Sequence, residues 1–102
     1  MPLTAGTLRR LSLVFDAAVL SEATALLEGC GRDLPFMQDA TEEGLERIRL
    51  AVLKLSGGDL ARLRDAIALA RTDWRDVLVA AGFDQLNAHL RWLPGDDLVR
   101  WD

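Results

Sequence analysis

Cysteine and histidine occur only once each in this 102-residue chain, as Cys30 and His89. A single cysteine cannot form a disulfide within the chain, and a lone thiol fits a reducing compartment. A zinc site usually takes three or four Cys, His or acidic ligands. The sequence also lacks the Gly-rich phosphate loops, HExxH and GxSxG that mark nucleotide, zinc-protease and serine-hydrolase sites. We therefore expect no metal and no cofactor.

Long apolar runs and an excess of positive charge are also missing. No run approaches the roughly 20 residues that cross a bilayer, and the N-terminus does not resemble a signal peptide. Twelve Lys and Arg against sixteen Asp and Glu give a net charge of −4, without the basic stripe that neutralises nucleic-acid phosphates. We expect a cytoplasmic protein with no membrane partner and no nucleic-acid partner.

Half of the residues are hydrophobic, whereas glycine (eight) and proline (three) are few and most of them stand at segment boundaries. That composition is sufficient for one hydrophobic core in a chain of common domain size. We interpret residues 1–102 as a single helical domain in which residues 94–102 form a C-terminal tail.

The strongest helix signal covers residues 41–56. Asp39 followed by Glu42 has the spacing of a capping box, and Gly57-Gly58 provides a stop. Apolar residues recur at helical intervals, with further leucines widening the stripe, so this helix should be central and contacted on two sides. The stripe consists of Leu45, Ile48, Leu50, Val52, Leu53 and Leu55.

Three further helices are predicted after Gly58. Asp59 caps a helix over 60–71, which should pack back against the helix at 41–56. Asp73 caps a helix over 74–81 that ends at Gly82. Asp84 caps a short helix to about Trp92, and Pro94-Gly95 ends it.

The first third of the chain contains one clear helix and one ambiguous segment. Residues 16–29 begin at the potential cap Asp16 and end at Gly29. In residues 4–15, Leu8, Leu11 and Phe15 fit a helix, whereas Leu11, Leu13 and Phe15 alternate as in a strand. We expect an all-α compact bundle of four to five helices. The alternative is an α+β fold with residues 7–15 as a strand paired across a dimer, because nothing else in the sequence reads as a strand.

The densest polar cluster is Arg71, Asp73, Arg75 and Asp76, to which His89 could be added as an acid–base group. The four residues of the cluster are better explained by a helix cap, by a first-turn acid at the helix dipole and by surface ion pairs. Cys30 follows a helix C-terminus, which disfavours the thiolate, so we expect it to be inert.

Apolar residues in a loop and in the tail are the strongest functional signal, because Trp and Met are enriched in interfaces. We predict a non-enzymatic protein–protein interaction or self-associating module, whose partner is another protein or a second copy in a homodimer. The same residues could instead cover the chain's own core. The interaction candidates are Leu34, Phe36, Met37, Trp92, Leu98, Val99 and Trp101.

Two alternative functions remain open at this point. One is a small ligand-binding domain or enzyme that uses the Asp73–Asp76 region with His89. The other is helix-turn-helix-like nucleic-acid binding by residues 60–71 and 74–81. The single-residue joint is shorter than the usual turn, and acidic residues begin the would-be recognition helix, which disfavours this second alternative.

Overall fold

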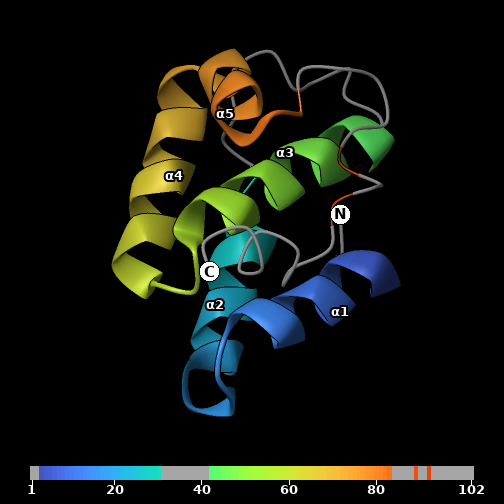
Figure 1. The fold of residues 1–102 in the computed structure, drawn as a ribbon, viewed down its shortest axis with the longest axis vertical. Helices are drawn as coiled ribbons and strands as arrows, with labels where there is room; N and C mark the ends of the chain where they lie inside the picture. Colours follow the sequence, from blue (N-terminus) through green and yellow to red (C-terminus); the bar gives the residue numbers. More distant parts are fainter. Residues whose placement is uncertain (1–2, 31–41, 84–88, 90–91, 93–102) are drawn as a thin grey trace, which may run out of the picture.

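A computed structural model describes residues 3–30 and 42–83, together with 89 and 92, apart from the side chains of 42 and 43. The described ranges contain five helices and no strand (Figure 1). The predicted all-α bundle is therefore confirmed. The helices are α1 (Ala5–Val14), α2 (Ala17–Gly29), α3 (Glu42–Ser56), α4 (Leu60–Thr72) and α5 (Trp74–Ala81).

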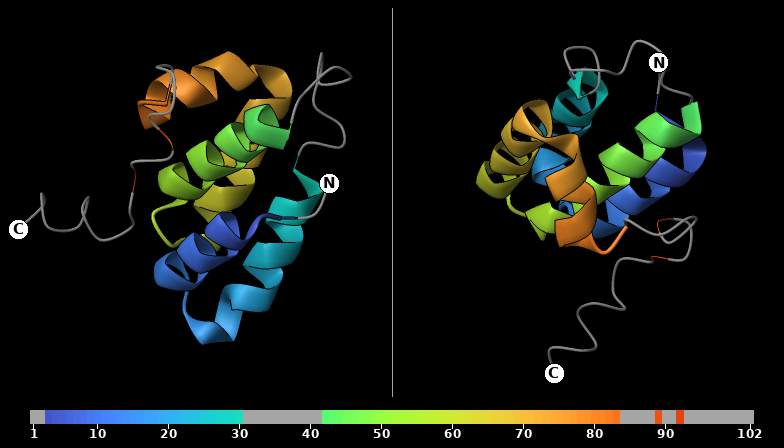
Figure 2. Two further views of the ribbon diagram at one scale, coloured as in Figure 1. Left: turned by 90° about the vertical axis from the view of Figure 1, so that its right-hand side faces the viewer. Right: turned by 90° about the horizontal axis from the view of Figure 1, so that it is seen from above.

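Helix α3 is the centre of the fold, as its apolar stripe predicts. It packs against α4, α5 and α1, while α2 closes the remaining side through contacts with α1 and α4 (Figure 2). Six consecutive residues of α3, from Ile48 to Leu53, are buried. A helix buried around most of its circumference must be contacted on several sides, which is what the packing shows.

The segment that could have been a strand is helix α1, so the α+β alternative is wrong. Thr4 caps α1 by accepting a hydrogen bond from the Thr7 amide. Leu11 and Phe15 are buried as expected, but Leu8 points outward and Thr7 takes the inner position. The reason is polar: the Thr4 and Thr7 hydroxyls lie 2.6 and 3.5 Å from Glu46 Oε1 on α3, which satisfies the buried hydroxyl.

The predicted helix ends agree with the structure wherever it describes them. Asp59 accepts from the amides of Ala61 and Arg62, and Asp73 accepts from the Arg75 amide. Gly82 ends α5 in the left-handed conformation. Asp16 occupies the N-cap position of α2 but makes no side-chain cap bond. The predicted capping box at Asp39, the helix beginning at Asp84 and the tail 94–102 lie outside the described residues.

The turn between α3 and α4 depends on glycine at two positions. Gly57 and Gly58 have φ angles of +58° and +88°, which favour a residue without a Cβ atom. A Cβ on Gly58 would also lie 2.9 Å from the carbonyl oxygen of Val14, at the end of α1. The turn therefore holds α4 beside α3 and at the same time touches the end of α1.

Replacing Gly58 with alanine is expected to destabilise the chain more than the same change at Gly57. Both substitutions place Cβ at a positive φ, which costs about 1–2 kcal/mol. Only the Gly58 variant meets a backbone atom, so it should lose about 1–3 kcal/mol more. Chemical denaturation of the two variants measures the difference, and equal losses would contradict the close approach to α1.

Candidate functional site

The basic residues of α3 serve the bundle's own architecture. Arg49 is only 3% exposed. Its Nε donates to the carbonyl oxygen of Cys30 at 3.1 Å, and its Nη2 donates to that of Glu28 at 3.1 Å. These carbonyls belong to the C-terminal end of α2, where the orphan acceptors and the helix dipole favour a cation. Arg49 thus joins α2 to the central helix.

Two further cations of α3 approach the C-terminal end of α5 in the same way. Lys54 Nζ donates to the carbonyl oxygen of Ala81 at 2.9 Å and lies 5.1 Å from the centroid of the Phe83 ring. Arg47 Nε donates to the Phe83 carbonyl at 2.6 Å. The Arg47/Arg49 pair, the nearest feature to a basic patch in mid-chain, is therefore directed at helix ends within the chain.

The predicted polar cluster is divided between the surface and the interior. Arg71, Asp73, Arg75 and Asp76 are all exposed at the junction of α4 and α5. Asp73 caps α5, and the Arg75 guanidinium lies 5.3 Å from the Trp74 ring centroid. His89, in contrast, is 1% exposed, with its ring edge-on to Phe83 at 6.4 Å between centroids. An acid–base site built on these residues would have to join a buried imidazole to carboxylates in solvent.

Among the predicted interaction residues, Trp92 lies within the described part of the chain. It is 8% exposed, with its ring 5.9 Å from the Phe83 ring, and its carbonyl accepts from Arg10 Nε at 3.0 Å. Its side chain belongs to this chain's core. The other interaction candidates lie outside the described residues: Leu34, Phe36, Met37, Leu98, Val99 and Trp101.

The structure reveals a surface that the sequence prediction missed, which we call the outer face of α1. Of the large hydrophobic residues that stay exposed, two are on this helix: Leu8 at 45% and Leu13 at 59%. A single charged side chain accompanies them on the exposed side of the helix. The outer face of α1 consists of Ala5, Leu8, Arg9, Ser12 and Leu13.

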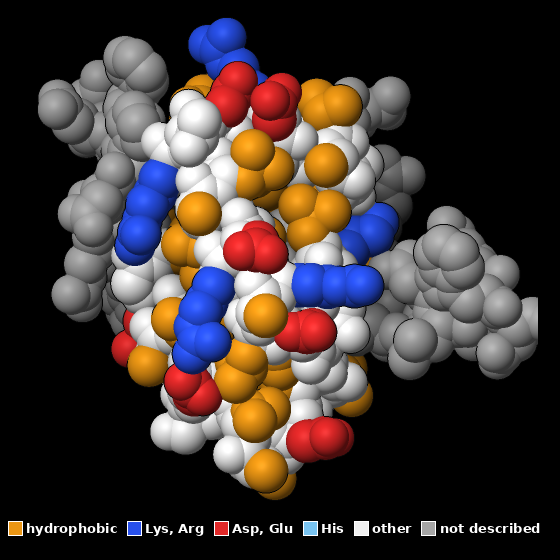
Figure 3. All heavy atoms as spheres, turned by 90° about the vertical axis from the view of Figure 1, so that its left-hand side faces the viewer, with side chains coloured by type: hydrophobic (Ala, Val, Ile, Leu, Met, Phe, Trp, Pro, Cys, Tyr) orange, Lys and Arg blue, Asp and Glu red, His pale blue; other side chains and the backbone are white. Residues whose placement is uncertain are grey.

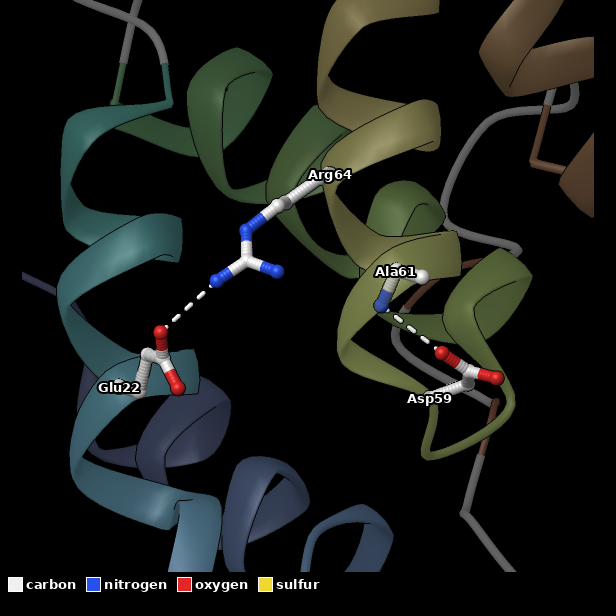
Figure 4. Close-up of polar contacts among 4 residues, drawn as sticks. All are labelled: Glu22, Asp59, Ala61 and Arg64. Carbon is white, nitrogen blue, oxygen red and sulfur yellow. Dashed lines mark hydrogen bonds and ion pairs between the residues drawn. The ribbon is translucent and has the colours of Figure 1, made fainter.

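The exposed side of α4 is quite different. It carries Arg62, Arg64, Asp65 and Arg71, and on this side of the molecule charged side chains of both signs stand among the hydrophobic ones (Figure 3). Arg64 Nη2 also makes an ion pair at 2.7 Å with Glu22 of α2 (Figure 4). Such a surface is suited to water, because its apolar groups are separated by solvated charges. The outer face of α1 has far less of this protection.

Cys30 has no character of a reactive thiol. Its side chain is buried at the end of α2, and this burial raises its pKa to about 11 even though Arg49 and Arg71 act in the opposite direction. The thiolate is the nucleophilic form, so the native protein presents very little of it at neutral pH. The expected inertness of Cys30 agrees with its environment.

The raised pKa of Cys30 predicts a loss of stability in alkaline solution. The pKa is about 11 in the folded chain against 9.0 for the model thiol, so the unfolded chain loses this proton first as the pH rises. The protonated Cys30 thiol contributes its full share of the free energy of unfolding below pH 9. This share, up to about 2–3 kcal/mol, is lost between pH 9 and 11. Urea denaturation from pH 8 to 11 should show a steeper decline than in Cys30→Ala, and parallel curves would contradict the assignment.

The comparisons with known proteins add no constraint. No family model matches the chain, and neither does any curated protein or solved structure. Within the described ranges, no group of three or more His, Cys, Asp or Glu could hold a metal ion, and no helix there is long and apolar enough to cross a membrane.

Proposed function

We propose that this chain is a non-enzymatic protein–protein interaction module that docks through the outer face of α1. The observation that supports this proposal is the exposure of Leu8 and Leu13 on a helix face whose single charge is Arg9. Burying both leucines against a partner would recover a substantial part of their transfer free energy, about 1.5–3 kcal/mol for each complete side chain. The occupant expected on this face is another protein.

The position of α1 in the bundle favours this interpretation. α1 lies at one side of the fold and packs against α2 and α3, so its remaining side is turned away from the core (Figures 1 and 2). Within the face, Arg9 lies between the two leucines in the sequence. Arginine is enriched in interface cores, where its planar fork can pair with carboxylates. The outer face of α1 thus combines apolar area with Arg9, whose pairing with a carboxylate can fix the orientation of a partner.

Position-specific crosslinking tests the proposal. A photoreactive maleimide attached to Ser12→Cys would lie within the outer face of α1, and the same probe on Thr72→Cys, at the exposed end of α4, is the matched control. The buried Cys30 should not compete for the label. In an extract of the source cells or with a second copy, position 12 should give protein adducts that position 72 does not give.

The adducts must also depend on the apolar side chains. In a Leu8→Ser/Leu13→Ser background, the yield at position 12 should fall at least several-fold while circular dichroism remains that of the parent. Equal yields from positions 12 and 72, or adducts that survive the loss of both leucines, would refute the outer face of α1 as the docking surface.

A further inference from the structure

The first two helices of the chain carry opposite charges. α1 contains Arg9 and Arg10 and has no acidic residue, whereas α2 contains Glu22 and Glu28 and has no basic residue. Arg9, Glu22 and Glu28 are all exposed. Because α1 and α2 pack against each other, a basic and an acidic helix surface lie next to one another in each copy.

The exposed side of α2 is made of small and acidic residues. Ala18, Ser21, Glu22, Ala25 and Glu28 follow one another at intervals of one or three residues, which places them along one side of the helix. Small side chains allow another helix to approach closely, and the two carboxylates can receive a guanidinium. The small side chains and the negative charge of this surface would complement the leucines and the arginine of the outer face of α1.

We infer that the partner of the outer face of α1 is a second copy of this chain, with α1 of each copy packed across the small, acidic side of α2 of the other. The inference rests on the proposed function and specifies the partner. Because α1 and α2 are neighbours, a single twofold axis can place α1 of each copy on α2 of the other. A twofold interface of this kind is closed and stops at the dimer. In the dimer, Leu8 and Leu13 lie over the alanines of α2, and Arg9 meets Glu22 or Glu28.

The existing contact of Glu22 does not obstruct this exchange. Its ion pair with Arg64 spans 2.7 Å, but the two side chains remain 54% and 53% exposed. An exposed pair of this kind contributes little to stability. Glu22 can therefore turn towards Arg9 of a second copy, where the leucines exclude water around the new pair.

The size of the two helices sets the expected strength of the dimer. At 1.5 Å per residue, α1 and α2 are about 15 and 20 Å long. A contact of that length is at or below the low end of specific interfaces, where association is transient. We therefore expect a dimer that forms in the micromolar range or above and weakens several-fold when the salt concentration is raised.

Sedimentation velocity of the full chain between about 10 µM and 1 mM, at low salt, tests the inference through reversed charges. Arg9→Glu alone and Glu22→Arg/Glu28→Arg alone should each weaken dimerisation at least tenfold. An equimolar mixture of the two variants should restore it, because both contacts of the heterodimer are again between opposite charges. Arg62→Glu, which changes one exposed arginine on α4 in the same way, should leave dimerisation within twofold of the wild type.

The outcomes separate this inference from the proposed function. A wild-type chain that remains monomeric at 1 mM, or a mixture that fails to recover dimerisation, overturns the self-pairing of α1 and α2. If leucine-dependent adducts at position 12 then form with a different protein, the outer face of α1 still stands as the docking surface. If dimers form but are insensitive to Arg9→Glu, a different face mediates them and the self-pairing of α1 and α2 fails, while the crosslinking at position 12 decides the proposed function separately.

Discussion

Replacing Arg49 with methionine is expected to lower the free energy of unfolding by about 3 kcal/mol, although the side-chain volume is nearly kept. The change leaves the carbonyl oxygens of Glu28 and Cys30 without their donor. The contact with Cys30 is buried and the contact with Glu28 is part-buried; a buried acceptor that loses its partner costs about 1–3 kcal/mol, and one that water can reach costs less. Relief of the buried charge offsets part of this cost. Urea denaturation followed by circular dichroism measures the result.

Arg64→Met is the matched control for this change. Arg64 is also a helical arginine with a partner on α2, but its ion pair with Glu22 is half-exposed and its loss should cost about 0–1 kcal/mol. Arg49→Lys should lie between the two, since it keeps the charge but loses the planar fork. Similar losses for Arg49→Met and Arg64→Met would show that the end of α2 does not depend on the buried guanidinium.

Val52→Ala is the second change with a large expected effect. Val52 is fully buried on the central helix, so the truncation removes apolar contacts and leaves a cavity, and we expect a loss of about 2–4 kcal/mol. Val79→Ala on α5 makes the same chemical change where the side chain is 63% exposed. That control should stay within about 0.5 kcal/mol of the wild type.

The comparison of the two valines tests directly whether α3 lies in the core and the outer side of α5 lies in solvent. If Val52→Ala cost well under 1 kcal/mol in chemical denaturation, α3 would not be the helix around which the others pack. If Val79→Ala cost as much as Val52→Ala, the exposed side of α5 would be covered by something else. In either case the division between core and surface that supports the docking proposal would need revision.

The helices could be predicted because their signals are local. Asp59, Asp73 and Gly82 fulfil their roles through amides and carbonyls within a few residues of themselves. The apolar stripe of 41–56 is so broad that only a central position satisfies it. In these segments the capping residue, the hydrophobic period and the terminating glycine or polar residue all predict the same helix. A sequence specifies its structure when signals at several levels agree in this way.

The orientation of α1 and the role of Arg49 could not be predicted, because both depend on contacts distant in the sequence. Thr7 faces inward because Glu46 of α3 is within hydrogen-bonding reach, and this turns Leu8 towards solvent. Arg49 is buried because α2 happens to end beside it. The hydrophobic periodicity within residues 5–14 and 42–56 predicts neither of these contacts.

The outer face of α1, which we propose as a docking surface, could not be predicted for the same reason. The sequence directs attention to apolar residues in a loop and tail, since these have no obvious helix face to occupy. In the structure, Trp92 is part of the core and Leu8 and Leu13 are exposed on a regular helix. Thr7 takes the inner position beside Glu46 of α3 and Leu8 the outer one, and the sequence of α1 does not show this contact between distant residues.

Native-state amide hydrogen exchange tests the central claim most directly, namely that the chain is organised around α3 and turns the outer face of α1 away from it. The amides of residues 48–53 should exchange slowest, with an opening free energy equal to that of global unfolding. Those of α1 should open at lower free energy in dilute solution. Fast exchange in α3, or protection in α1 that exceeds it at every protein concentration, would contradict the account.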